Sequence, residues 1–285
     1  MRIINNQQEF NQLCSDLLRE PSVFLDTEFD RRRTYYATLS LIQIATQNQR
    51  IIIDALSGID LQLFGTVLSD NNVCKILHAP DQDFDIFYHL FGKLPKNIFD
   101  TQIAAGVIGL EKGIGYARLC KTLLNINIDK TLQKANWLER PLSNKSLNYA
   151  IKDVEYLIPL YRELSNSLNS RDLWDAYNAR SKKLVQPETY KLNLDRMMKK
   201  ANILDRSEDL KTRFKNLALF REECAQILNI PRGRCASEEN LVTLSEQLPI
   251  TDRALSKLHM DRLPITKRKF KHKLLALCLG MHEQN

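Results

Sequence analysis

Residues 24–29 (FLDTEF) place two acids inside an otherwise apolar segment that is typical of a buried β-strand. Asp26 and Glu28 are two positions apart, so both side chains leave the same face of that strand. Neighbouring carboxylates repel each other, and burying them without a partner is costly. A bound divalent cation would resolve the repulsion, whereas a strand end in water would leave both acids hydrated. The strand alone leaves these alternatives open.

The apolar pattern predicts an α/β domain over residues 1–170, because short strands come first and helices are interleaved later. The strands are expected at 22–29, 38–46, 50–54 and 73–78, and the helices at 59–68, 81–91, 100–110, 116–124 and 146–169. Polar residues 171–210 are expected to form a helical linker. Residues 211–285 are expected to form a small all-helical domain, with a turn at 231–233 and helices capped by Ser237 and Thr251.

Composition narrows the class of protein. A chain of 285 residues, 44% hydrophobic and 26% charged, is long enough for about two domains and is not disordered. It lacks both a signal peptide and an apolar run near the ~20 residues of a membrane span, so we expect a cytoplasmic protein with no membrane partner. The six scattered cysteines are expected to be reduced thiols. The net charge of +7 suits a polyanionic partner.

More acids lie where the predicted strand 73–78 gives way to a helix, the usual edge for an active site in an α/β sheet. Asp81, Asp83 and Asp85 are three candidates there for a functional acid. Asp81 is best placed to cap the helix N-terminus. Farther along, Tyr149 and Asp153 are four residues apart and share one helix face.

Together these segments resemble the ribonuclease D family. Its first exonuclease motif is similar to residues 26–44, its second to residues 78–102 with Asp83, and its third to residues 136–153. The C-terminal unit resembles a helicase-and-ribonuclease-D C-terminal (HRDC) domain in its helical pattern and in its basic residues Arg221, Arg232, Arg234, Arg253 and 267–273.

The resemblance implies a DEDD-type 3′→5′ exonuclease on a ribonuclease-H-like fold, a mixed β-sheet flanked by helices. It implies that Asp26, Glu28, Asp83 and Asp153 hold two divalent ions, Mg²⁺ or Mn²⁺, and that Tyr149 orients the attacking water. Asn148 stands where a related subclass has histidine, which favours the tyrosine subclass. The chain departs from the family at Ala37, where proline is usual, and in having room for a single helical C-terminal domain.

The expected substrate is the 3′ end of RNA, with tRNA precursors suggested by the family, and no obligate protein partner is expected. Substrate contacts are expected at five residues, because arginine pairs with phosphate and aromatic rings stack on unpaired bases. They are Arg31, Arg33, Tyr35, Trp137 and Arg140. Core packing is the alternative for Trp137, and an ion pair is the alternative for Arg140. A 3′→5′ DNA exonuclease and an RNA-binding protein with a vestigial nuclease site are the alternative functions.

Overall fold

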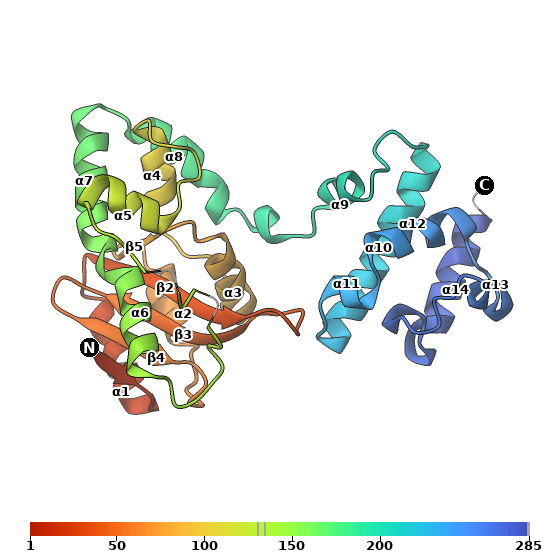
Figure 1. Cartoon of the computed structure of the whole chain (residues 1–285), viewed down its shortest axis with the longest axis horizontal. Coiled ribbons are helices and arrows are strands. Elements are labelled where there is room, and N and C mark those ends of the chain that lie inside the picture. The colour runs from red at the N-terminus through yellow and green to blue at the C-terminus, as the bar shows by residue number, and fades with distance from the viewer. Residues whose placement is uncertain (130, 134, 284–285) are drawn as a thin grey trace. The chain divides into compact units, whose positions relative to one another are not determined.

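In a computed structural model that describes residues 1–129, 131–133 and 135–283, the chain forms two compact units (Figure 1). The first unit comprises residues 1–30 and 38–190, and the second comprises residues 31–37 and 191–285. The expected linker 171–210 is therefore divided between them. Tyr177 packs in the core of the first unit and Met197 in that of the second, so this polar segment is not a separate linker.

The first unit is built on a six-stranded mixed sheet of order β1-β4-β3-β2-β5-β6. Its strands are β1 (Arg2–Ile4), β2 (Ser22–Asp30), β3 (Thr38–Ala45), β4 (Arg50–Asp54), β5 (Cys74–Leu77) and β6 (Ile98–Asp100). The predicted meander is confirmed, since β3 pairs antiparallel with both β2 and β4. The remaining pairs are parallel. Strands β1 and β6 were not predicted, because three residues are too few to show an alternating pattern.

Helices flank this sheet (Figure 1). They are α1 (Gln7–Leu17), α2 (Phe64–Ser69), α3 (Asp81–Phe91), α4 (Thr101–Val107), α5 (Tyr116–Leu124), α6 (Asn144–Glu155), α7 (Leu157–Ser170) and α8 (Trp174–Ser181), with 3₁₀ turns η1 (Lys182–Val185) and η2 (Pro187–Tyr190). The single helix predicted over 146–169 is two helices, which meet at Tyr156. Helix α1 was missed, because its few apolar residues lie among glutamines, asparagine and acids.

One face of the sheet packs against α4–α8 through a core that includes Phe24, Leu41 and Ile76. Helix α6 lies along β2, β3 and β4 on this face. Because side chains alternate along a strand, Asp26 and Glu28 leave β2 on the same face as Phe24, whereas Thr27 points to the opposite face. The fold thus directs both acids towards α6.

The second unit is helical, as predicted. Its elements are α9 (Leu194–Lys200), α10 (Glu208–Leu228), α11 (Arg232–Cys235), α12 (Glu238–Gln247), α13 (Asp252–Ser256), η3 (Pro264–Thr266) and α14 (Arg268–His282). Ser237 caps α12 in a reciprocal capping box with Asn240, and Thr251 caps α13, which confirms both predicted helix starts. The turn predicted at 231–233 is wrong, because a short helix, α11, begins there directly after Pro231.

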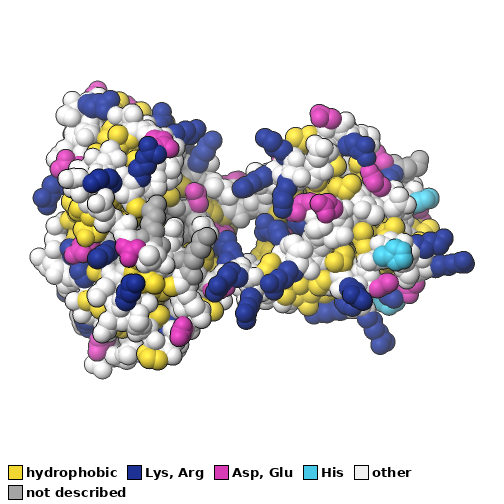
Figure 2. Space-filling view, in the orientation of Figure 1, with side chains coloured by type: hydrophobic (Ala, Val, Ile, Leu, Met, Phe, Trp, Pro, Cys, Tyr) yellow, Lys and Arg dark blue, Asp and Glu magenta, His cyan; other side chains and the backbone are white. Residues whose placement is uncertain are grey.

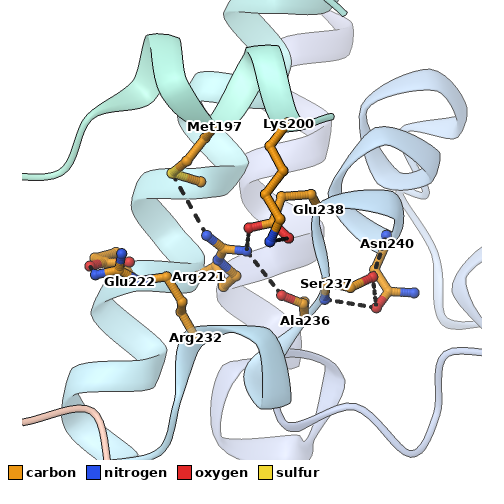
Figure 3. A network of polar contacts seen from close by, with 9 residues as sticks. All are labelled: Met197, Lys200, Arg221, Glu222, Arg232, Ala236, Ser237, Glu238 and Asn240. Carbon is orange, nitrogen blue, oxygen red and sulfur yellow. Dashed lines mark hydrogen bonds and ion pairs between the residues drawn. The ribbon is translucent and has the colours of Figure 1, made fainter. Parts of the chain in front are cut away.

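Arg221 lies in the interior of the second unit (Figure 3). Its guanidinium donates to the Ala236 carbonyl at 3.0 Å and pairs with Glu238 at 3.4 Å, and Lys200 pairs with the same Glu238 at 2.9 Å. These contacts tie α9, α10 and α12 together. Arg221, one of the basic residues in which this unit resembles an HRDC domain, is thus an interior residue, because its side chain is 0% exposed.

All six cysteines are free thiols, as expected, and five of them are buried. Among the described residues, every helix is too short or too polar to cross a membrane.

Candidate active site

Three acids from two elements meet on the α6 side of the sheet. Asp26 and Glu28 come from β2 and Asp153 from α6, and one carboxylate oxygen of each lies within 4.8 Å of the other two. All three side chains are half-buried. Such a group of hard oxygen ligands suits Mg²⁺ or Mn²⁺, which bind carboxylates in preference to softer donors.

Local sequence explains how α6 presents Asp153. The Ser143 hydroxyl accepts the Ser146 N–H at 3.1 Å and starts the helix. Leu147, Ala150 and Val154 then form its buried face. Tyr149 and Asp153, one helical turn apart, lie at the margin of that face, and both are half-buried.

Asp83 lies outside the group of three and comes from the first turn of α3. Its carboxylate accepts a hydrogen bond from the Thr27 hydroxyl, and its side chain is buried. The prediction that Asp81 caps this helix is wrong. Pro80 occupies the N-cap position and makes no side-chain hydrogen bond. The exposed Asp81 is the first helical residue, one position after the N-cap, so its side chain does not cap the helix.

Burial raises the pKa values of all four acids, and repulsion within the cluster adds to the shift at Asp26 and Glu28. Burial, followed by the charges of Asp83, Asp153 and Glu28, raises the pKa of Asp26 well above its usual value. Burial and the charges of Asp153 and Asp83 raise the pKa of Glu28 to about 9. Burial raises the pKa of Asp153 to about 7 and that of Asp83 to about 6, although the hydrogen bond from Thr27 opposes the shift at Asp83. Cations that neutralise the cluster would reverse these shifts.

In metal-free buffer, the melting temperature should therefore fall as the pH rises from about 5 to about 8. The folded chain keeps the Glu28 proton throughout this range and the Asp153 proton up to about pH 7, whereas the unfolded chain, with acid pKa values near ~4, has released both. Stability is thus greatest at the acidic end and is lost as the pH rises through the folded-state values. Thermal melts in EDTA check this, with Asp153→Asn as the comparison. Its curve should be flatter than that of the wild type, and parallel curves would contradict the prediction.

Tyr149 is placed to keep its phenolic proton. Burial, together with the charges of Asp153, Glu28 and Asp26, raises its pKa further above the ordinary value near ~10. Its ring packs 6.1 Å from that of Trp137. A phenol that stays protonated next to three carboxylates can hold and orient a water molecule, but it is a poor proton acceptor.

Trp137 and Arg140 occupy structural positions. The Trp137 side chain is 3% exposed and belongs to the core between the sheet and α6. The Arg140 guanidinium forms a two-point ion pair with Asp54, at 2.8 Å and 2.7 Å, and also donates to the carbonyls of Trp137 and Glu139. These contacts favour the core and ion-pair alternatives for the two residues.

Arg140→Ala should lower the free energy of unfolding by about 3 kcal/mol, because it leaves the Asp54 carboxylate partly buried and unpaired. Burial alone would raise the pKa of Asp54, but hydrogen bonds from Arg140 outweigh it and hold that pKa below its usual value. Urea unfolding of Arg140→Ala, Asp54→Ala and the double variant measures the coupling. A role in RNA binding alone would leave the unfolding curve of Arg140→Ala unchanged.

The other three predicted substrate contacts lie in the loop of residues 31–37, which belongs to the second unit. Arg31 and Arg33 are exposed. Tyr35 is half-buried, and its hydroxyl donates to Glu222 and accepts from Gln226 at 3.1 Å. The backbone N–H groups of Tyr35 and Tyr36 both donate to the Asn229 side chain. The Tyr35 ring is thus held within the helical unit.

Two residues near the acids were missed in the sequence. The Tyr116 hydroxyl donates to the Lys152 carbonyl at 2.8 Å, and its pKa is raised by burial and by charges that include Asp153 and Asp26. No sequence signal marks Tyr116, which lies far from the motif segments. Thr27 lies between the two predicted ligands Asp26 and Glu28, but no role was predicted for it. The alternation of side chains along a strand places Thr27 on the opposite face, and this signal was available in the sequence.

Comparisons with known proteins identify the family of this chain. A family model described as a 3′-5′ exonuclease matches residues 1–169. Ribonuclease D of Sphingobium indicum is 34% identical over 258 residues, which cover 90% of this chain and 66% of that protein. Ribonuclease D of Nitrobacter hamburgensis is 33% identical over 259 residues, which cover 90% and 68%. This chain thus spans about two thirds of the length of these curated relatives.

The crystal structure of Escherichia coli RNase D, described as an exoribonuclease involved in structured RNA processing, has a TM-score of 0.85 to this chain at 28% identity. The similarity covers 98% of this chain and 74% of that one. A matched exonuclease region and similarity along nearly all of the chain lead to one conclusion: the protein belongs to the ribonuclease D family.

Proposed function

We propose that this protein is a metal-dependent 3′→5′ exoribonuclease that removes nucleotides from RNA 3′ ends. The observation that carries the proposal is the convergence of Asp26, Glu28 and Asp153 in a chain of the ribonuclease D family. Their half-buried oxygens fit divalent cations, and their raised pKa values mark a cluster that lacks compensating positive charge. Asp83 is the fourth ligand in this proposal.

Two divalent ions, when bound, would activate the attacking water and stabilise the leaving 3′ oxygen. The chain supplies the rest. Asp26 lies within reach of the charges of the other three acids and is the central ligand. Tyr149, of the tyrosine subclass, orients the water with a hydroxyl that stays protonated. Arg31 and Arg33, exposed and positively charged, are the proposed phosphate contacts, because guanidinium groups pair well with phosphate oxygens.

The proposed substrates are tRNA precursors and other structured RNAs with free 3′ ends, processed in the cytoplasm without an obligate protein partner. Purified protein is incubated with a 3′-extended tRNA and with single-stranded DNA of the same 3′ sequence, with Mn²⁺, with Mg²⁺ or with EDTA. Metal-dependent release of mononucleotides from the RNA is expected, and a 3′-phosphate block should suppress it. Faster cleavage of the DNA would favour the DNA exonuclease. Binding without cleavage in either metal would favour the vestigial site.

The helical unit is proposed to be an HRDC-like RNA-binding domain. Its basic surface supports this proposal. Lysine and arginine side chains are spread over its visible face (Figure 2). Lys267, Arg268 and Lys269 are consecutive and exposed at the start of α14. Three adjacent cations on one short segment are suited to contacts with successive phosphates.

Replacing Lys267, Arg268 and Lys269 together by Ser should weaken tRNA binding and reduce the slope of log affinity against log salt by about 2, because three fewer phosphates are neutralised. A triple variant of the exposed Lys93, Lys112 and Lys121 in the first unit makes the same change in net charge and is the matched control. Binding titrations across a salt series measure both slopes. Equal slopes for the two triple variants would show a general charge effect and count against an RNA surface at α14.

A further inference from the structure

The Thr27 hydroxyl and the Asp83 carboxylate form a buried contact between β2 and α3. The hydroxyl donates to Oδ1 of Asp83, and the two residues are 5% and 7% exposed. Thr27 stands between Asp26 and Glu28 in the sequence, but its side chain leaves the opposite face of the strand. Thus β2 carries Asp26 and Glu28 on one face, and its Thr27 side chain on the other face contacts a third acid, Asp83.

The Thr27 hydroxyl is one of several donors to the Asp83 carboxylate, because the backbone N–H groups of Thr27 and of Asp83 itself also hydrogen-bond to it. The N-cap position of α3 has no side-chain hydrogen bond, and the described group of mutually close acids consists of Asp26, Glu28 and Asp153. Repulsion from Asp26 acts on Asp83 in the absence of cations, since each charge disfavours the other. The hydrogen bonds to the Asp83 carboxylate oppose this repulsion, and the one from the Thr27 hydroxyl to Oδ1 can be removed by a substitution that leaves the backbone donors in place.

We infer that Thr27 is a positioning residue for Asp83, whose hydroxyl holds Oδ1 and leaves Oδ2 available to a divalent cation. This inference rests on the proposed function, in which Asp83 is a metal ligand. A hydroxyl that donates to one oxygen restricts the rotation of the carboxylate and, together with the backbone donors, offsets the repulsion from Asp26. Partners that orient metal ligands in this way typically alter metal affinity by about 10–100-fold when they are removed.

A merely structural threonine would behave differently. Loss of a buried hydroxyl on its own lowers the melting temperature and leaves the affinities for cations unchanged. Loss of a positioning hydroxyl weakens the one cation that depends on Asp83, while the cation held by Asp26, Glu28 and Asp153 keeps its affinity. The two roles therefore separate in a metal titration that distinguishes a tighter from a weaker ion.

The test is Mn²⁺ binding to the full chain, followed by calorimetry and by the electron paramagnetic resonance of free Mn²⁺. Thr27→Val and Thr27→Ala both remove the hydroxyl, so that a folding defect in one leaves the other to be measured. Thr27→Ser restores it. Thr266→Val is the matched control, because Thr266 is also 5% exposed and donates its hydroxyl, at 2.7 Å, to the Met260 carbonyl in the second unit.

We expect Thr27→Val and Thr27→Ala to weaken the second Mn²⁺ by about tenfold or more, Thr27→Ser to restore it to within about threefold, and Thr266→Val to match the wild type. Unchanged Mn²⁺ binding in the hydroxyl-free variants would overturn the inference, as would equal weakening of both ions. Hydrolysis by the wild type is measured separately. If the wild type cleaves RNA and Thr27→Val binds Mn²⁺ as the wild type does, the inference is rejected and the proposed function stands. If the wild type binds Mn²⁺ but cleaves no nucleic acid, the proposed function is rejected.

Discussion

Asp26→Asn should reduce RNA hydrolysis by about a thousandfold or more while leaving the chain folded. The change removes the charge of the acid that interacts with all three of the others, and metal-assisted hydrolysis depends on several kcal/mol of charge stabilisation. Asparagine keeps the size of the side chain, so the packing of Phe24 and Leu25 on β2 is undisturbed.

In metal-free buffer at pH 8, the same variant should melt at a higher temperature than the wild type. Burial and repulsion raise the pKa of Asp26, so its ionised form destabilises the folded state, and a neutral amide relieves that repulsion. Turnover in Mn²⁺ and thermal melts in EDTA are measured in parallel, with Asp175→Asn, an exposed acid on α8, as the control. Retention of more than about a tenth of wild-type turnover would remove Asp26 from the metal site.

Asp83→Ala should also lose nearly all turnover, whereas alanine at Asp81 or Asp85 should leave most of it. Asp83 is buried against Thr27, and the charge of its carboxylate reaches Asp26. Asp81 is exposed in the first turn of α3, where interaction of an acid with the helix dipole contributes about 0.3–1 kcal/mol. Its charge also opposes ionisation of Asp83 and Asp100, which offsets part of this contribution.

Turnover and melting temperature of the three alanine variants, measured side by side, decide which acid serves the reaction. Asp81→Ala should show a small loss of stability and Asp83→Ala a large loss of turnover. Asp85 is half-buried in the second turn, and its variant should be mild in both measurements. An inactive Asp85→Ala together with an active Asp83→Ala would mean that the second motif has been assigned two residues too early.

Most of the helices and strands that could be predicted from the sequence were marked by patterns that span several residues. The strands around Asp26 and the meander that follows were predicted because alternation and β-branching persist over eight or nine residues. The Ser237 cap was predicted because a serine, an acidic first turn and the apolar residues of the helix follow one another in a single segment. Strands β1 and β6, with three residues each, carry no such pattern, and tertiary pairing alone makes them strands.

Properties that depend on which residues meet in three dimensions were out of reach. The sequence gives only the charge of Arg221, and its interior position follows from the partners Ala236 and Glu238, which lie outside its own helix. The same holds for the contact of Thr27 with Asp83. The gathering of Asp26 and Glu28 with Asp153 could be predicted from the family resemblance, not from spacing. The metal-binding role of the four acids stays a prediction.

The group of three acids draws on the second strand of its sheet and on a helix near the end of the first unit's sequence. During synthesis on the ribosome, β2 emerges long before α6, so a nascent chain has two of these acids and lacks the third. Contacts between such distant segments form late in folding, since the long intervening loop must be closed first. Under the proposed function, the cation site would therefore be complete only after the sheet and α6 have come together, and a nascent chain that ends before α6 would lack the activity proposed for the folded protein.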